Sequence, residues 1–166
     1  MQNKTAEQHI NEMLTGNTRK KALDFVSFLR AREMLLERGG GYWADKCYWG
    51  AWFDGEPVCT FLIGAEEARQ APDNFIIWSD NSGSGWYENA EIDEQSKEIF
   101  WQNVDICGSC GFCPGGTGKT VFSREFDSVC STTFRFDNPN ADAIKCAMIM
   151  AELRKNDITL NKNREN

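Results

Sequence analysis

Asp54-Gly55 restricts the fold of this chain more than any other pair of residues, because it separates two runs rich in apolar and aromatic side chains, 42–53 and 56–63. Both residue types tolerate a positive φ, which a two-residue turn between antiparallel strands requires. The sequence therefore predicts a β-hairpin over these two runs.

A two-residue turn also predicts which residues of the hairpin face each other. Positions whose numbers sum to 109 then pair, so Cys47 lies opposite Leu62 and Cys59 lies opposite Gly50. In this register the two cysteines point to opposite faces of the hairpin. We therefore expect both thiols to be small apolar core residues and not the halves of a disulfide.

Both faces of the predicted hairpin are largely apolar, which leaves two alternatives. Either helices cover both faces, or one face lines an aromatic cavity that binds a small molecule. The candidate lining residues are five tryptophans along and after the hairpin: Trp43, Trp49, Trp52, Trp78 and Trp86. Because the register places Trp52 on the opposite face from Trp43 and Trp49, the five cannot all line one pocket.

Apolar periodicity and capping residues predict the remaining elements. Asn138 is a suitable cap for a final helix, and Pro139 suits its first turn. The predicted helices cover residues 4–14, 19–37, 91–102 and 139 to about 154. The predicted further strands cover residues 74–78, 120–122 and 132–136.

This order of elements predicts an α+β fold. We expect an antiparallel sheet with the N-terminal and C-terminal helices packed on it, and a cysteine-rich loop. Residues 1–155 form a single globular domain in this interpretation, and residues 156–166 form a polar, frayed C-terminal tail.

The composition argues against several classes of protein. A formal net charge of -7 opposes binding to the phosphate backbone of nucleic acids. No apolar run approaches the roughly 18 residues that a membrane-spanning helix needs. The seven cysteines are odd in number, and the polar N-terminal residues do not resemble a signal peptide, which favours reduced thiols. We therefore expect a cytoplasmic protein with no nucleic-acid or membrane partner.

The richest chemistry lies in a loop with three evenly spaced cysteines: Cys107, Cys110 and Cys113. Gly108 and Gly111 lie between them, and without a Cβ these residues allow the tight turns that let sulfur atoms converge. Zinc prefers four ligands in a tetrahedron, so a fourth ligand must come from elsewhere. Cys130, in a non-helical segment, is the leading candidate, ahead of the single histidine, His9, and of Cys146 in the last predicted helix.

Four other interpretations of this loop are weaker. A four-iron cluster motif would have its fourth cysteine at Thr117, although a cluster completed by Cys130 stays open. A thiol–disulfide redox motif needs a helix that Pro114 and the glycines after it oppose. A phosphate-binding loop ending in residues 118–120 would need a glycine where Cys113 lies. Unbound thiols are the fourth interpretation, and exposed thiols at this density are prone to oxidation.

Three motifs of the second half of the chain carry a resemblance: Asn-Val-Asp-Ile-Cys through Cys-Pro-Gly at 103–115, Phe-Asp-Ser-Val-Cys at 126–130 and Phe-Arg-Phe-Asp-Asn-Pro at 134–139. They resemble a family of small uncharacterised bacterial proteins, and residues 75–86 fit it more loosely. The resemblance implies that all four cysteines, Cys130 included, belong to one shared pattern. It implies no catalytic residue.

Binding is therefore the leading expected function. We expect a structural zinc held by four cysteines, together with a small molecule, cationic or aromatic, at the Trp-rich sheet. An iron–sulfur or metal-dependent enzyme is the second alternative, and a protein-interaction module is the third. Carboxylate pairs such as Asp80 with Glu88 are present, but no pair is marked above another as an acid–base couple.

Overall fold

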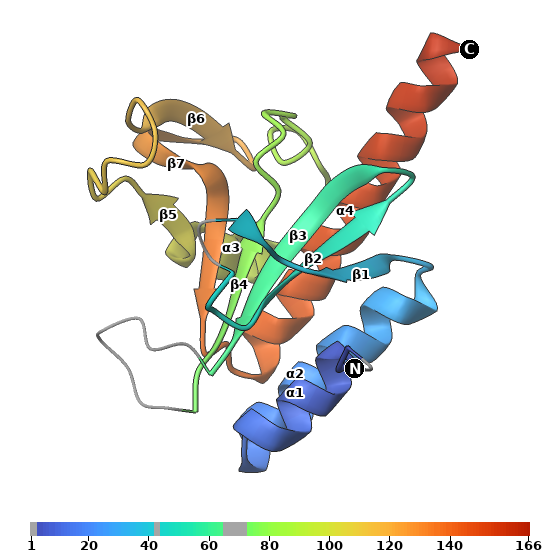
Figure 1. Ribbon diagram of the computed structural model, residues 1–166. Helices are drawn as coiled ribbons and strands as arrows, with labels where there is room; N and C mark the ends of the chain where they lie inside the picture. Colours follow the sequence, from blue (N-terminus) through green and yellow to red (C-terminus); the bar gives the residue numbers. More distant parts are fainter. Residues whose placement is uncertain (1–2, 42–43, 65–72) are drawn as a thin grey trace.

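The structure is a computed structural model that describes residues 3–41, 44–64 and 73–166 (Figure 1). Its helices are α1 (Ala6–Met13), α2 (Gly16–Ala31), α3 (Glu94–Gln102) and α4 (Ala141–Glu165). Its strands are β1 (Leu35–Arg38), β2 (Tyr48–Phe53), β3 (Glu56–Ile63), β4 (Phe75–Ser79), β5 (Val104–Ile106), β6 (Thr117–Val121) and β7 (Arg124–Asp137). No helix in these ranges is long and apolar enough to cross a membrane.

All the strands join one antiparallel sheet in the order β1-β2-β3-β4-β7-β5, with β6 paired to β7 off this path. The long strand β7 pairs with different strands along its length: its first half pairs with β6, and its last residues pair with β4. Between these halves Thr133 adopts a φ of 52°, a conformation that turns the strand. The α+β fold with an antiparallel sheet is thus confirmed.

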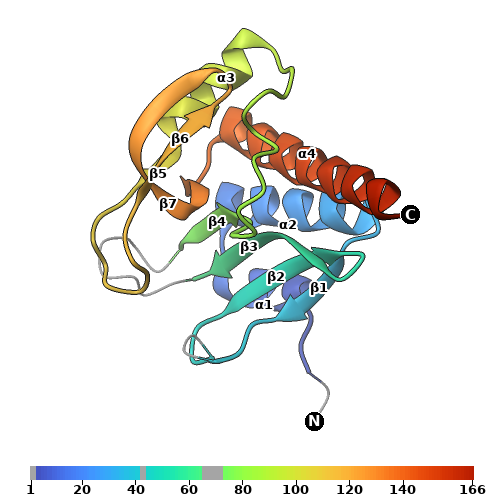
Figure 2. The ribbon, with the colours of Figure 1, turned by 90° about the horizontal axis from the view of Figure 1, so that it is seen from above.

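The described helices pack on a single face of the sheet. Phe25 of α2 lies 6.1 Å, between ring centroids, from both Phe61 and Phe75, and Phe100 of α3 lies 6.0 Å from Phe136. Helix α4 lies beside α2 on this same side (Figure 2). The alternative in which helices cover both faces is therefore wrong for the described part of the chain.

The other face of the sheet carries a small separate core. Leu62 and Ile76 face each other across β3 and β4 and are buried, with Tyr48 and Trp78 packed against them. This face therefore excludes water at its centre, although no described helix packs on it.

The predicted hairpin is confirmed, with Asp54 and Gly55 both at positive φ, but its register changes within the strands. Trp52 pairs with Pro57, as predicted, whereas Ala51 pairs with Cys59 because β3 contains one extra residue there. The extra residue is Val58, and Pro57 beside it has no N–H to donate to the ladder.

This bulge overturns the predicted separation of two cysteines. Cys59 is shifted by one position and shares the helix-covered face with Cys47, whose carbonyl accepts a hydrogen bond from the Ile63 amide at 2.9 Å. Both thiols are buried and neither forms a disulfide, as expected for apolar core residues. Burial raises the pKa of both thiols, that of Cys59 the more, so they stay protonated at neutral pH.

The predicted helix over 19–37 is too long. Helix α2 ends at Ala31, Glu33 reverses the chain with a φ of 61°, and Leu36 then pairs with Ala51 in the edge strand β1. Leu36 has suitable spacing for the helix, but the same side chain also fits the alternation of a strand beside β2. The open edge of β2 offers backbone hydrogen bonds that decide between the two.

The final helix differs from its prediction at both ends. Asn140, not Asn138, is the cap, and its side chain accepts hydrogen bonds from Asp142 and Ala143. Asn138 instead accepts from the Phe75 amide at 2.8 Å and so ties the chain to β4. The predicted frayed tail from 156 onward is helical to Glu165, because Ile158 is buried and Lys162 donates to the Asp54 carbonyl at 2.9 Å.

Candidate functional site

The cysteine loop begins and ends beside the same residue of β7. Ile106, at the end of β5, and Thr117, at the start of β6, both pair with Val129 from opposite sides. The Cys107 amide adds a hydrogen bond to the Ser128 carbonyl at 2.8 Å. The two strands therefore fix the base of the loop on β7. Strand β5, for which the sequence predicts no element, is what provides one of these anchors.

Two of the predicted ligands lie on one side of this base. Ser128 and Cys130 are two residues apart in β7 and therefore point to the same side. Cys107, the residue after β5, lies beside Ser128, since a Cβ at Gly116 would meet both side chains. Burial raises the pKa of Asp105, and the nearby charge of Asp137 also raises it. The positive charge of Arg135 and a hydrogen bond with Cys130 lower this pKa. The Cys130 thiol thus lies against Asp105, next to the start of the loop.

Gly116 closes the base of the loop. A Cβ added there would lie 2.5 Å from the Cys107 Cβ and 2.5 Å from the Ser128 Oγ, closer than real Cβ atoms approach. Only glycine lets the returning chain lie this near to Cys107.

The other two predicted ligands lie farther out. Cys110 and Cys113 are exposed, and residues 108–115 contain no buried side chain. Ser109 and Gly111 have positive φ values of 55° and 84°, which give the loop its turns. Within residues 3–41, 44–64 and 73–166, no three Cys, His, Asp or Glu side chains converge as metal ligands would.

The rival ligands occupy unrelated places. His9 packs against Trp49, with ring centroids 6.0 Å apart, and its Nε2 lies 2.9 Å from Arg38. Burial lowers the pKa of this imidazole, with Arg38 the next cause. Cys146 is buried in α4 with its thiol 3.9 Å from the Ser96 carbonyl. Both side chains therefore have structural contacts of their own.

The phosphate-loop interpretation also fails in the structure. Residues 117–121 form β6 rather than a loop that opens a helix. Lys119 donates to the Cys130 carbonyl at 2.9 Å and to the Thr133 Oγ1 at 2.8 Å, so its ammonium group holds the bend of β7. Burial lowers the pKa of this lysine.

The predicted tryptophans do not form one pocket. Trp49 is buried on the helix-covered face, whereas Trp52, against Gly50, and Trp78, opposite Thr60, lie on the other face. Trp86 is buried in the loop after β4, and Trp43 lies outside the described residues. Only Trp52 and Trp78 share a surface among those that the structure describes.

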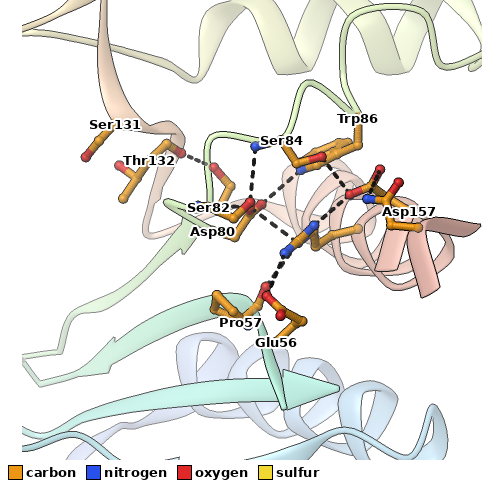
Figure 3. A network of polar contacts seen from close by, with 12 residues as sticks. Glu56, Pro57, Asp80, Ser82, Ser84, Trp86, Ser131, Thr132 and Asp157 are labelled. Atoms are coloured by element: carbon orange, nitrogen blue, oxygen red, sulfur yellow. Dashed lines mark hydrogen bonds and ion pairs between the residues drawn. The ribbon is translucent and has the colours of Figure 1, made fainter. Parts of the chain in front are cut away.

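A buried ion pair joins Asp80, directly after β4, to Arg154 of α4, and none of the motifs above predicts it (Figure 3). The side chains of Asp80 and Arg154 are 3% and 4% exposed, and the Arg154 Nε lies 3.3 Å from Asp80 Oδ2. The same Nε donates to the Pro57 carbonyl at 3.0 Å, next to the bulge of β3. The Arg154 guanidinium therefore contacts both Asp80 and the backbone beside the bulge.

Asp80 and Asp157 both contact Arg154, and each carboxylate accepts further hydrogen bonds. Asp80 accepts from the Trp86 indole at 2.9 Å and from the Ser82 hydroxyl. Asp157 accepts from Arg154 Nη1 at 2.6 Å and from the Ser84 hydroxyl at 2.7 Å (Figure 3). The loop after β4 is therefore tied to α4 by charge-assisted hydrogen bonds.

The glycines of the cysteine loop provide a matched test of its base. We expect Gly116→Ala to lower the free energy of unfolding by about 1–3 kcal/mol, because its methyl group would collide with Cys107 and Ser128. Gly108→Ala is the control, since a Cβ there meets no atom within 4 Å and its φ is not positive. Urea unfolding of both variants measures the difference, and equal stabilities would contradict the packing described for Gly116.

Comparison with known proteins adds no relative: no protein-family model, curated protein or solved structure matches the chain. The resemblance of the cysteine motifs to a bacterial family stays a prediction.

Proposed function

We propose that this protein binds one structural zinc ion through Cys107, Cys110, Cys113 and Cys130. The metal would close the loop between β5 and β6 onto β7. In this proposal the zinc holds the loop in a fixed shape and takes no part in a reaction.

The observation that carries the proposal is the placement of Cys107 and Cys130 on the same side of the β5–β7 pair. Zn–S bonds are about 2.3 Å long, so four sulfurs must gather around one point. In this proposal the Cys107 and Cys130 thiols would supply two of the four ligands from the base of the loop. Cys110 and Cys113 belong to the loop that returns to this base at Gly116, and they would move inward to complete it.

The loop also needs a stabilising group. Because residues 108–115 bury no side chain, the loop draws no stability from the hydrophobic core. Binding of zinc by thiolates contributes directly to the folding free energy of such segments. A small-molecule site built from the five predicted tryptophans has less support, since the four described ones lie in three separate places.

Titration with Co²⁺ under reducing conditions tests the ligand set. The wild-type protein is expected to bind one equivalent and to give the absorption spectrum of tetrahedral cobalt with four thiolates. Cys130→Ser should weaken binding at least tenfold and lower the thiolate-to-cobalt absorption. Cys146→Ser, which changes a buried thiol outside the loop, should leave both unchanged.

Two results would contradict the proposal. One is a cobalt spectrum and affinity that Cys130→Ser does not alter. The other is equal loss in Cys146→Ser and Cys130→Ser, which would indicate a general effect on folding. A brown protein with bound iron would instead favour the cluster alternative.

A further inference from the structure

A cavity of about 470 Å³ opens beside the buried arginine, and it is separate from the cysteine loop. The C-terminal half of α4, the start of β3 and the loop after β4 line it. Its lining includes Glu56, Arg154, Asn161, Lys162 and Glu165. Its volume falls within the range of small-molecule sites.

Arg154 presents an unused donor to this cavity. Its Nε and Nη1 atoms donate to Pro57 and Asp157, but its Nη2 has no hydrogen-bond acceptor among the described residues. The contact of Nη2 is an ion pair with Glu56 Oε2 at 3.8 Å, which is beyond hydrogen-bond distance. An arginine whose side chain is 96% buried thus keeps one amino group for a ligand or water.

The charge around the cavity is negative. Asp80 and Asp157 already flank the Arg154 guanidinium, and Asp54 pairs with Lys162 at 3.2 Å. Glu56 and Glu165 also line the cavity. Among the described residues, Glu165 has no ion-pair partner, and Glu56 has only the long contact with Arg154. This balance disfavours an anionic ligand, although an arginine lies at the floor.

We infer that the cavity binds a small primary amine that carries an oxygen acceptor on the neighbouring carbon. The ammonium group pairs with the Glu56 carboxylate, and the oxygen accepts a hydrogen bond from Arg154 Nη2. The 3.8 Å between these two protein atoms suits two ligand atoms on adjacent carbons. The neighbouring Asn161 side chain and the Glu165 carboxylate offer further acceptors for an ammonium or hydroxyl group.

Amino sugars and the amino-terminal unit of peptides share this chemistry, so the experiment uses one probe from each source. The pairs are D-glucosamine with D-glucose, and L-alaninamide with N-acetyl-L-alaninamide. Binding is followed by NMR through the Trp86 indole N–H, which is bonded to Asp80 beside the guanidinium. At least one amine should bind at least tenfold more tightly than its neutral partner. The tighter of the two amines identifies the source.

Substitution of Glu56 tests the site directly. Its side chain is 55% exposed, so Glu56→Gln should fold normally while it removes the charge that pairs with the amine. The advantage of the amine over its neutral partner should then fall below threefold. Glu125→Gln, in the exposed start of β7, is the matched control and should leave the advantage unchanged.

The inference is overturned if no probe shifts the indole signal, or if the neutral compounds bind as tightly as the amines. It is equally overturned if Glu56→Gln and Glu125→Gln retain the same preference for the amine.

Discussion

Asp80→Ala is expected to lower the free energy of unfolding by about 3–5 kcal/mol, because it removes the most buried of the carboxylates that pair with the buried Arg154 guanidinium. The substitution also removes the acceptor of the Trp86 indole N–H and of the Ser82 hydroxyl. Urea unfolding followed by circular dichroism measures the loss.

Two further variants separate this effect from a general sensitivity to charge. Glu94 is 81% exposed and pairs with Lys97. Glu94→Gln should lower the free energy of unfolding by at most about 1 kcal/mol. Arg154→Met combined with Asp80→Ala removes both buried charges and should recover part of the stability lost in Asp80→Ala. If Asp80→Ala costs no more than Glu94→Gln, the ion pair does not hold the loop after β4 to α4.

Phe100→Ala is expected to have an effect of similar size, about 3–5 kcal/mol, since it opens a cavity at the centre of an aromatic cluster. The Phe100 ring is fully buried, and its centroid lies 4.9 Å from that of Phe122 and 5.0 Å from that of Phe134. Through these rings α3 packs on β7, which carries Cys130.

Leu160→Ala is the control for this substitution. Leu160 is 57% exposed on α4, so its truncation should change stability by no more than about 0.5 kcal/mol. Thermal unfolding of both variants is the measurement. A Phe100→Ala protein as stable as Leu160→Ala would contradict the packing of α3 on β7.

Local sequence signals predict the parts of the fold that depend on neighbouring residues. Asp54-Gly55 predicts the hairpin turn, because the positive φ of this turn is a property of the two residues themselves. Short, largely continuous apolar runs predict β3 and β4, because such runs bounded by turn residues are typical of buried strands. The antiparallel α+β class follows from the order of these elements.

Features that depend on distant residues could not be predicted in this way. The Pro57 bulge shifts the hairpin register, and its carbonyl is satisfied by Arg154, which lies 97 positions along the chain. Leu36 joins a strand only because the edge of β2 is open to it. Both outcomes need the tertiary arrangement, which no local pattern contains.

One half of the buried ion pair, Arg154, could have been predicted from the sequence. Ala147, Ala151, Arg154 and Ile158 recur at helical spacing, and this places an arginine on the apolar face of the last helix. A buried arginine needs an acidic partner, which predicts a carboxylate across the core but does not identify Asp80. For the cysteine site, the sequence predicts the ligand types, and the strands add the common side of Cys107 and Cys130.

Metal analysis of the protein, purified under reducing conditions without added metal, tests the central claim most directly. Binding by four cysteines predicts one zinc per chain, no visible colour, and loss of the zinc in Cys107→Ser and in Cys130→Ser. Reduced, folded wild-type protein that contains no zinc and takes up none when it is supplied would contradict the zinc site.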